Sequence, residues 1–353
     1  MKLAIIGLPQ SGKTTIYNAL TRSNQPTDMG GKMEIHTAVV DVPDPRVTVL
    51  TEMYQPKKTA FAKVTYSDIA GLEGSGQGDI SGKMVNELGQ MDGFIQVVRC
   101  FESDNVPHIS GTVDPGRDIQ SMDSELLLND LIVVERRIER LTDERKKGGR
   151  DKLAVEKEMA LFEKLQNILM EDSPLRAADL SEEENKHISG YQFLTMKPML
   201  IVLNLGESQD TPDVSSAIKD SRVVALQGQL EMEIAQLAPE EAEIFLKEYK
   251  IEEPSLYLMI RESYELLGLI SFFTVGEDEV RAWTVKKGAA APVAAGGIHT
   301  DLQKGFIRAE IVSYEDLTTL GSMSAARDQG KLRVEGKTYI VKDGEIMHVR
   351  FNV

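Results

Sequence analysis

The feature that most constrains this chain is a glycine-rich segment directly after its first apolar run. Residues Leu3–Ile6 have the character of a buried strand and lead into the pattern Gly-x-x-x-x-Gly-Lys-Thr, which begins at Gly7. A helix-compatible stretch, Thr15–Leu20, follows at once. The pattern requires this strand–loop–helix context if it is to bind phosphate. It therefore predicts a site for a nucleoside triphosphate with magnesium.

Each fixed position of the loop has a chemical reason. Gly7 and Gly12 let the backbone curl so that successive N–H groups point at phosphate oxygens, and the following helix adds the positive end of its dipole. Lys13 supplies a point charge for the β- and γ-phosphates and is a candidate catalytic group, and the hydroxyl of Thr14 can bind Mg²⁺. The nucleotide-binding residues predicted from this loop are Pro9, Gln10, Ser11, Gly12, Lys13, Thr14 and Thr15.

Composition limits the class of protein. The 353 residues are 41% hydrophobic and 27% charged, which describes a globular chain long enough for two or three domains. The single cysteine excludes an internal disulfide, and no apolar stretch approaches the roughly 20 residues of a membrane span. A net charge of −16 argues against coating of nucleic acid by bulk charge. We therefore expect a cytoplasmic protein, without a secretory signal, that contacts neither a membrane nor DNA.

Apolar runs separated by helical stretches predict a mostly parallel sheet covered by helices on both faces, which is an α/β fold. In such folds the ligand lies at the carboxyl ends of the strands. The strands are predicted at Leu3–Ile6, Ala62–Asp68, Gly93–Arg99, Met199–Asn204 and Arg222–Leu226. The residues that end or follow them are expected to converge on one crevice: Gly7, Asp68, Arg99, Asn204 and Leu226.

A long helical insertion separates the third and fourth predicted strands, between about Asp118 and Gln192. Apolar residues at alternating spacings of four and three are typical of a narrow coiled-coil seam, and they are Leu127, Leu131, Val134, Ile138 and Leu141. A turn with two glycines, Arg145–Arg150, then reverses the chain, so we predict an antiparallel helical hairpin. Its basic tip could contact RNA phosphate, although a solvated turn explains so short a run at least as well.

From about Leu269 onward strand signals dominate, separated by glycine-rich turns such as Ala290–Gly297, with one short helix near Tyr314–Leu320. This pattern predicts a small β-rich domain of the β-grasp kind. Its strands are expected at Ser271–Val275, Val280–Thr284, Ile307–Val312, Lys337–Val341 and Ile346–Phe351. The predicted domains are a nucleotide-binding domain (residues 1–117 and 193–268), a helical hairpin insertion (118–192) and a C-terminal domain (269–353).

Segments outside the phosphate loop carry a resemblance to a known family over nearly the whole chain. The sequence resembles the Obg-like ATPases, the YchF branch of the translation-factor-related P-loop proteins, as a divergent member. That family has a helical hairpin inserted in its nucleotide-binding domain and a C-terminal TGS domain of the β-grasp fold. The resemblance implies both here. The matching segments are Val42–Arg46, Asp68–Leu72, Val98–Glu102, Asn105–His108, Asn204–Glu207, Ile270–Gly276, Arg281–Val285 and Ile298–Arg308.

The resemblance implies slow hydrolysis of ATP with Mg²⁺, coupled to the ribosome or ribosomal RNA, by a protein that we expect to be a monomer. Asp68 would hold Mg²⁺ together with Thr14, and the N–H of Gly71 would meet the γ-phosphate. Leu72 stands where many GTPases place a glutamine that orients water, and an apolar side chain cannot do this. The resemblance makes His108 the candidate, because a neutral imidazole can orient or deprotonate an attacking water near pH 7.

The segment Asn204-Leu-Gly-Glu207 occupies the position of the guanine-recognising Asn-Lys-x-Asp segment of GTPases. Leu205 replaces the lysine, and Glu207 replaces the aspartate that accepts hydrogen bonds from guanine. Adenine presents one amine and an acceptor at N1, so the guanine site loses its purpose. ATP is therefore favoured over GTP, although GTP is not excluded. Gln227, where the family has Ser-Ala near the base, completes the predicted base site.

Departures from the family pattern leave the mechanism open. Lys32 stands where the family's switch threonine completes the coordination of Mg²⁺, and Gln10-Ser11 replaces the usual Asn-Val in the phosphate loop. Two other hypotheses therefore stand beside an ATPase switch. One is a GTP-binding regulator of the same architecture. The other is an adaptor for the ribosome or RNA that nucleotide stabilises and that has negligible turnover.

Overall fold

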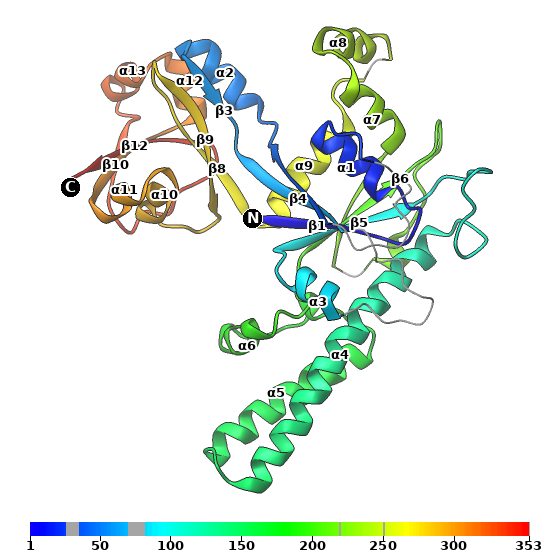
Figure 1. Cartoon of the computed structure of the whole chain (residues 1–353). Coiled ribbons are helices and arrows are strands. Elements are labelled where there is room, and N and C mark those ends of the chain that lie inside the picture. Colours follow the sequence, from blue (N-terminus) through cyan, green and yellow to red (C-terminus); the bar gives the residue numbers. More distant parts are fainter. Residues whose placement is uncertain (26–34, 70–81, 219, 250, 353) are drawn as a thin grey trace. The chain divides into compact units, whose positions relative to one another are not determined.

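The computed structural model describes residues 1–25, 35–69, 82–218, 220–249 and 251–352 (Figure 1). Lys32, Gly71 and Leu72 lie outside these ranges, so what the sequence indicates for them stays a prediction. By its internal contacts the chain divides into two compact units. The first contains Met1–Ala38 and Thr65–Leu256, and the second contains Val39–Val64 and Tyr257–Val353.

The first unit is built on a six-stranded sheet of order β2-β4-β1-β5-β6-β7, in which the described pairs from β4 to β7 are all parallel. The strands of this sheet are β1 (Lys2–Ile6), β2 (Ile35–Asp41), β4 (Lys63–Ile69), β5 (Gly93–Arg99), β6 (Met199–Asn204) and β7 (Arg222–Leu226), of which β2 and β4 each include residues that the division assigns to the second unit. The five strands predicted from the sequence are confirmed, and β2 is an addition. Every residue of β5 and β6 is buried, as expected for central strands that are covered on both faces.

Helices cover both faces of this sheet (Figure 1). On one face lie α1 (Lys13–Thr21) and α7 (Gly228–Gln236), and on the other lie α3 (Gly82–Gly89) and α4 (Pro115–Lys147). On the second face, buried side chains of β1, β5, α3 and α4 form one apolar cluster, which includes Ala4, Ile6, Phe94, Met84, Leu88, Met122 and Leu126. The carboxyl ends of the strands are left for a ligand. The unit also contains α8 (Pro239–Glu248), the start of α9 (Ser255–Leu266) and 3-10 turns at Leu175–Ala177, Ser189–Tyr191 and Ser215–Ala217.

The predicted helical hairpin is formed by α4 and α5 (Lys152–Met170), and α6 (Glu182–Ile188) follows it. α4 begins after Asp114, whose side chain accepts the N–H of Arg117, and it ends at Gly148, whose φ of 70° suits a helix end. The predicted seam is confirmed, because its side chains form one buried core, with Leu131 and Ile138 half-buried beside it. The buried members include Leu127, Val134, Leu141, Val155, Phe162, Leu165 and Leu169.

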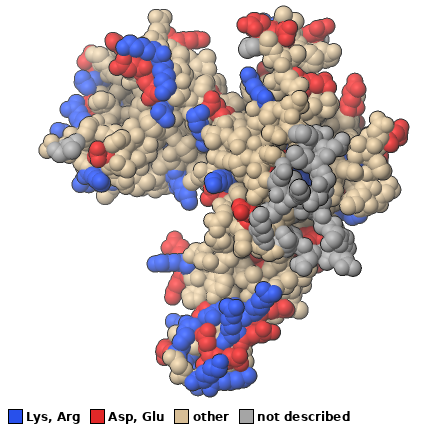
Figure 2. Space-filling view, in the orientation of Figure 1, with Lys and Arg blue, Asp and Glu red and all other residues tan. Residues whose placement is uncertain are grey.

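The tip of the hairpin carries both signs of charge (Figure 2). Arg150 pairs with Glu144 (Nη1–Oε2, 2.7 Å) and with Glu158 (Nη2–Oε2, 3.0 Å). Arg137 contacts the same two carboxylates. The hairpin's own carboxylates therefore neutralise part of the basic tip that the sequence predicts.

The second unit carries a mixed sheet of order β11-β10-β12-β8-β9-β3. Its strands are β3 (Lys58–Ala60), β8 (Leu269–Thr274), β9 (Glu279–Lys286), β10 (Phe306–Ser313), β11 (Arg333–Glu335) and β12 (Glu345–Phe351). β3 pairs in parallel with β9, and this pairing, with α2 (Pro45–Tyr54), places residues 39–64 in the second unit. The sequence assigns these residues to the nucleotide-binding domain, so the boundary differs there.

Two local predictions for the C-terminal part are wrong. The expected turn Ala290–Gly297 forms α10 (Ala291–Ile298), because Pro292 stands in the first turn, where a helix needs no N–H from it. The expected strand Lys337–Val341 forms a turn, in which Tyr339 N–H donates to Gly336, and one isolated bridge. The helix expected near Tyr314–Leu320 is confirmed as α12 (Tyr314–Leu320), and the remaining helices are α11 (Thr300–Lys304) and α13 (Met323–Asp328).

The predicted fold class is confirmed: an α/β nucleotide-binding fold with an inserted helical hairpin and a β-rich C-terminal domain. Across the described ranges, no helix combines the length and the apolar character that crossing a membrane requires.

Candidate functional site

The phosphate loop has the backbone that its two glycines predict. Gly7 has a φ of 149° and Gly12 a φ of 94°, which side chains of L-residues rarely permit. A Cβ atom at Gly7 would lie 2.3 Å from the carbonyl oxygen of Val97, and one at Gly12 would lie 2.2 Å from Nδ2 of Asn204. Both positions therefore require glycine for space as well as for conformation. Within the described ranges of the chain, no side-chain hydrogen bond caps the start of α1 after Gly12, which suits a helix end that receives a phosphate.

The predicted binding residues of the loop differ in exposure. Ser11 and Lys13 are buried, Pro9, Gly12, Thr14 and Thr15 are half-buried, and Gln10 is exposed. The ammonium group of Lys13 donates to the carbonyl oxygen of Leu8 (2.9 Å), so the side chain folds back along the loop. A bound phosphate would offer this ammonium group a charged acceptor, and a hydrogen bond between charged groups is stronger than one to a carbonyl.

Thr14 and Asp68, the predicted Mg²⁺ ligands, meet at the carboxyl ends of β1 and β4. Thr14 Oγ1 donates to Asp68 Oδ2 (3.0 Å), and Asp68 is 1% exposed. Its Oδ1 is buried and has no hydrogen-bond partner among the residues that the structure describes, and burial raises the pKa of this carboxyl above its usual value. A buried carboxylate with one unpartnered oxygen beside a hydroxyl is a suitable donor set for a hydrated Mg²⁺ ion. The residues present therefore fit the ion.

Asn204, at the end of β6, connects two loops of the site. It is 4% exposed, its Nδ2 donates to the carbonyl oxygen of Ser11 (2.9 Å), and its Oδ1 accepts the N–H of Gly228 (2.9 Å). The side-chain amide therefore holds the phosphate loop against the segment after β7, which contains Gln227. A direct contact between Asn204 and a base stays a prediction.

The other predicted base-site residues lie nearer the surface. Leu205 is half-buried and packs against an apolar cluster that includes Val98 and Leu203. Glu207 is exposed, and Gln227 is half-buried. The loop from Asn204 to Glu207 therefore directs its apolar side chain inward and its carboxylate toward solvent.

Gln209 is a residue of this site that sequence reasoning missed. Its Oε1 accepts the N–H of Gly206 (2.7 Å), and its Nε2 donates to the carbonyl oxygen of Cys100 (2.6 Å). No motif marks this position, because the bridge exists only when β5 and β6 lie side by side. The predicted parallel arrangement of the strands is the signal that could have suggested a contact between the loops after β5 and β6.

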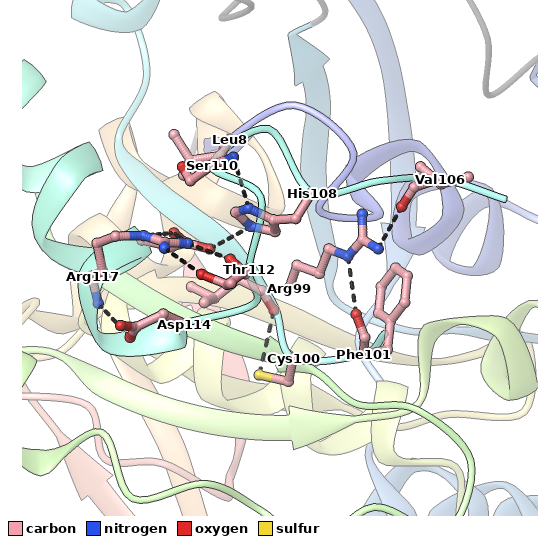
Figure 3. Close-up of polar contacts among 12 residues, drawn as sticks. Leu8, Arg99, Cys100, Phe101, Val106, His108, Ser110, Thr112, Asp114 and Arg117 are labelled. Atoms are coloured by element: carbon pink, nitrogen blue, oxygen red, sulfur yellow. Dashed lines mark hydrogen bonds and ion pairs between the residues drawn. The ribbon is translucent and has the colours of Figure 1, made fainter. Parts of the chain in front are cut away.

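His108 lies beside the phosphate loop, and both nitrogens of its ring are engaged (Figure 3). Leu8 and Ser11 line the same small cavity as His108 and Asp118. The Nδ1 atom accepts the N–H of Ser110 (3.1 Å), and Nε2 lies 2.8 Å from Asp118 Oδ2. Because Nδ1 is an acceptor, the ring proton is on Nε2 and is donated to the carboxylate.

The carboxylate that holds His108 is itself fixed. Arg117 donates to Asp118 Oδ1 through Nε (3.0 Å) and Nη2 (2.8 Å). The side chain of His108 is 3% exposed. In this conformation the imidazole cannot accept a proton from a water molecule, so its predicted catalytic role requires the loop to rearrange and stays a prediction.

Arg99 ends β5 and shapes the loop that carries His108. Its Nε donates to the carbonyl oxygen of Phe101 (3.0 Å) and its Nη2 to that of Val106 (2.7 Å), while the guanidinium lies 4.6 Å from the centre of the Phe101 ring (Figure 3). Its Nη1 is buried and meets no hydrogen-bond partner in the part of the chain that the structure describes. Next to it, burial and then the charge of Asp118 raise the pKa of the Cys100 thiol to about 12, so this thiol is unreactive.

A loop of this geometry between a buried strand and a helix, beside an acidic residue at the end of a neighbouring parallel strand, defines the P-loop nucleoside triphosphate-binding proteins. The chain is one of them. It is 41% identical to the "Ribosome-binding ATPase YchF" of Bacillus subtilis (strain 168), over 99% of this chain and 98% of that protein. It is 42% identical to the protein of the same name from Escherichia coli O157:H7, over 100% and 99%. The chain therefore belongs to the YchF family.

Two further comparisons agree with this assignment. Residues 269–352 match the family model YchF-GTPase_C, described as "Protein of unknown function (DUF933)". The solved structure of the Schizosaccharomyces pombe YchF GTPase matches with a TM-score of 0.87 at 33% identity and covers 99% of this chain and 97% of that chain. The resemblance seen in the sequence is therefore confirmed over the full length.

Proposed function

We propose that this protein is a Mg²⁺-dependent nucleotide switch that prefers ATP to GTP and hydrolyses it slowly. We further propose that the nucleotide state controls its binding to the ribosome or ribosomal RNA in the cytoplasm, and that it acts as a monomer. The ribosomal part rests on relatives that are named ribosome-binding ATPases. The nucleotide and Mg²⁺ part rests on the residues around the phosphate loop.

The loop after β6 carries the proposed preference for ATP. Leu205 packs inward, so it cannot serve as the lysine of a guanine site. Glu207 is exposed and one methylene longer than the aspartate that accepts two hydrogen bonds from guanine. A solvated, longer carboxylate is poorly fixed, and discrimination between bases depends on polar groups that are held in place. The advantage that a GTPase gives to guanine is therefore weakened.

Calorimetric titration of nucleotide-free protein with Mg·ATP and with Mg·GTP tests this preference. We expect ATP to bind at least about tenfold more tightly, which corresponds to about 1.4 kcal/mol. Equal affinities, or tighter binding of GTP, would contradict the proposal and favour a GTP-binding regulator of the same fold. Failure to bind either nucleotide would exclude a nucleotide switch altogether.

The second candidate function is a nucleotide-stabilised adaptor with negligible turnover, and the bonding of His108 favours it. A histidine whose two ring nitrogens are occupied by Ser110 and Asp118 cannot assist an attacking water. Single-turnover hydrolysis with and without ribosomes separates the two functions. Turnover that ribosomes accelerate at least about tenfold supports the enzyme, whereas no turnover under either condition supports the adaptor.

A further inference from the structure

Gln209 joins the two loops that follow neighbouring strands. β5 and β6 pair in parallel up to Arg99 and Asn204, so the residues beyond them leave the sheet side by side. Cys100 N–H donates to the carbonyl oxygen of Asn204 (2.9 Å) and continues this contact by one residue. Beyond that point the connection is made by the Gln209 side chain, which accepts from Gly206 N–H (2.7 Å) and donates to the Cys100 carbonyl oxygen (2.6 Å).

The bridge made by Gln209 fixes a part of the loop after β6 that Asn204 does not reach. We call this loop, residues 204–209, the base loop. Asn204 holds the start of the loop through Ser11 and Gly228, as described above. Farther along, Ser208 has a φ of 53°, a left-handed backbone conformation that is unfavourable for a residue other than glycine and needs support from its surroundings. The two hydrogen bonds of Gln209 supply this support on the side of the loop that faces β5.

The same bridge sets the distance between the base loop and the loop after β5, which contains Phe101. A Cβ atom on Gly206 would lie 3.3 Å from Cβ of Phe101 and 3.3 Å from Oε1 of Gln209. A side chain at position 206 would therefore require its neighbours to shift by a few tenths of an ångström. A loop held this tightly presents its backbone N–H and carbonyl groups at fixed positions.

We propose that Gln209 is a positioning residue that determines base selectivity, by fixing the backbone of residues 205–207 against the loop after β5. This inference rests on the proposed function, because it requires a purine base at this loop. Selectivity arises when a wrong base leaves fixed polar groups unpaired, and a displacement of about 1 Å is enough to remove it. Without the bridge, the loop can adapt to either purine.

The test uses the full chain with Gln209→Ala, and measures affinity for Mg·ATP, Mg·GTP and Mg·tripolyphosphate by calorimetry. Loss of two hydrogen bonds is expected to weaken ATP binding about tenfold and to bring the ratio of ATP to GTP affinity close to one. Tripolyphosphate contains no base, so its affinity is expected to stay within about twofold.

A second variant and a control accompany this test. Gln209→Glu keeps the acceptor for Gly206 but cannot donate to Cys100 when ionised, and it should give an intermediate ratio of ATP to GTP affinity. Gln329→Ala, an exposed glutamine in the other unit, serves as the matched control.

The outcomes separate this inference from the proposed function. If the wild-type protein prefers ATP and Gln209→Ala keeps the same preference, the role of Gln209 is overturned and the proposed function stands. A parallel loss of tripolyphosphate affinity also overturns it, because the variant would then have disturbed the phosphate loop itself. If the wild-type protein shows no preference, the proposed function fails, and the inference fails with it.

Discussion

Replacing Lys13 by methionine is expected to lower the affinity for Mg·ATP by at least about 100-fold, or about 2.7 kcal/mol. Methionine keeps a long unbranched side chain but removes the charge that would face the β- and γ-phosphates. Lys13 is 8% exposed, so solvent and salt screen its charge little. Removing one partner of a buried, charged hydrogen bond costs about 2–5 kcal/mol, because the other charge is left unpaired. Calorimetric titration with Mg·ATP measures the effect.

The matched control is Lys57→Met. Lys57 and its partner Asp278 (Nζ–Oδ1, 2.7 Å) are both exposed and both belong to the second unit, which does not contain the phosphate loop. This variant should therefore bind ATP as the wild type does. Lys13→Met also loses the bond to the Leu8 carbonyl oxygen, which is expected to cost about 1 kcal/mol of stability, so thermal unfolding is measured to check that the variant is folded. A folded Lys13→Met protein with affinity near that of the wild type would mean that triphosphate does not bind in this loop.

The central sheet could be predicted because β5 and β6 are continuous apolar runs that are buried along their whole length. β2 was missed because none of its residues is buried, so no apolar run marks it. β3 has three residues, and its partner β9 lies more than 200 positions away in the sequence. A pairing between such distant segments leaves no local signal, which explains why the sequence does not place residues 39–64 in the second compact unit.

In the candidate site, too, some features could be predicted from the sequence and others could not. The position and backbone conformation of the phosphate loop could be predicted, because the spacing of its glycines follows from the geometry of a phosphate held by backbone N–H groups. The contact between Thr14 and Asp68 follows from the convergence of parallel strand ends. The bond between His108 and Asp118 and the bridge made by Gln209 depend on how loops pack after the strands have paired. Such contacts have no fixed spacing, so the sequence does not reveal them.

Replacing Asp130 by alanine is expected to lower the free energy of unfolding by about 3–5 kcal/mol. Asp130 lies on α4, is 2% exposed, and accepts hydrogen bonds from Leu194 N–H (2.8 Å), Thr195 N–H (2.7 Å) and the Thr195 hydroxyl (2.6 Å). Alanine would leave these buried donors unsatisfied, at about 1–3 kcal/mol each. Because the bonds join α4 to the segment that enters β6, amide exchange should also accelerate there.

Urea denaturation measures the loss, and Asp143→Ala is the matched control on the same helix. Asp143 is 64% exposed and lies 3.7 Å from Lys146, so its removal should change stability by less than about 0.5 kcal/mol. If the two variants were equally stable, the carboxylate of Asp130 would not anchor the hairpin to the sheet.

Asp130 also predicts a dependence of stability on pH that is opposite to that of most carboxylates. Burial outweighs the three donors and raises its pKa to about 6, from an ordinary value of 3.8. Because the folded state holds the proton more tightly, the contribution of Asp130 to stability is complete below about pH 3.8 and is lost as the pH rises through 6. The part lost between pH 5 and pH 7 is roughly 1 kcal/mol. Asp130→Asn does not titrate, so urea denaturation at pH 5, 6 and 7 should show a smaller loss of stability in this variant than in the wild type. Equal losses of stability in the wild type and in Asp130→Asn would mean that the pKa of Asp130 is at its ordinary value and that burial does not raise it.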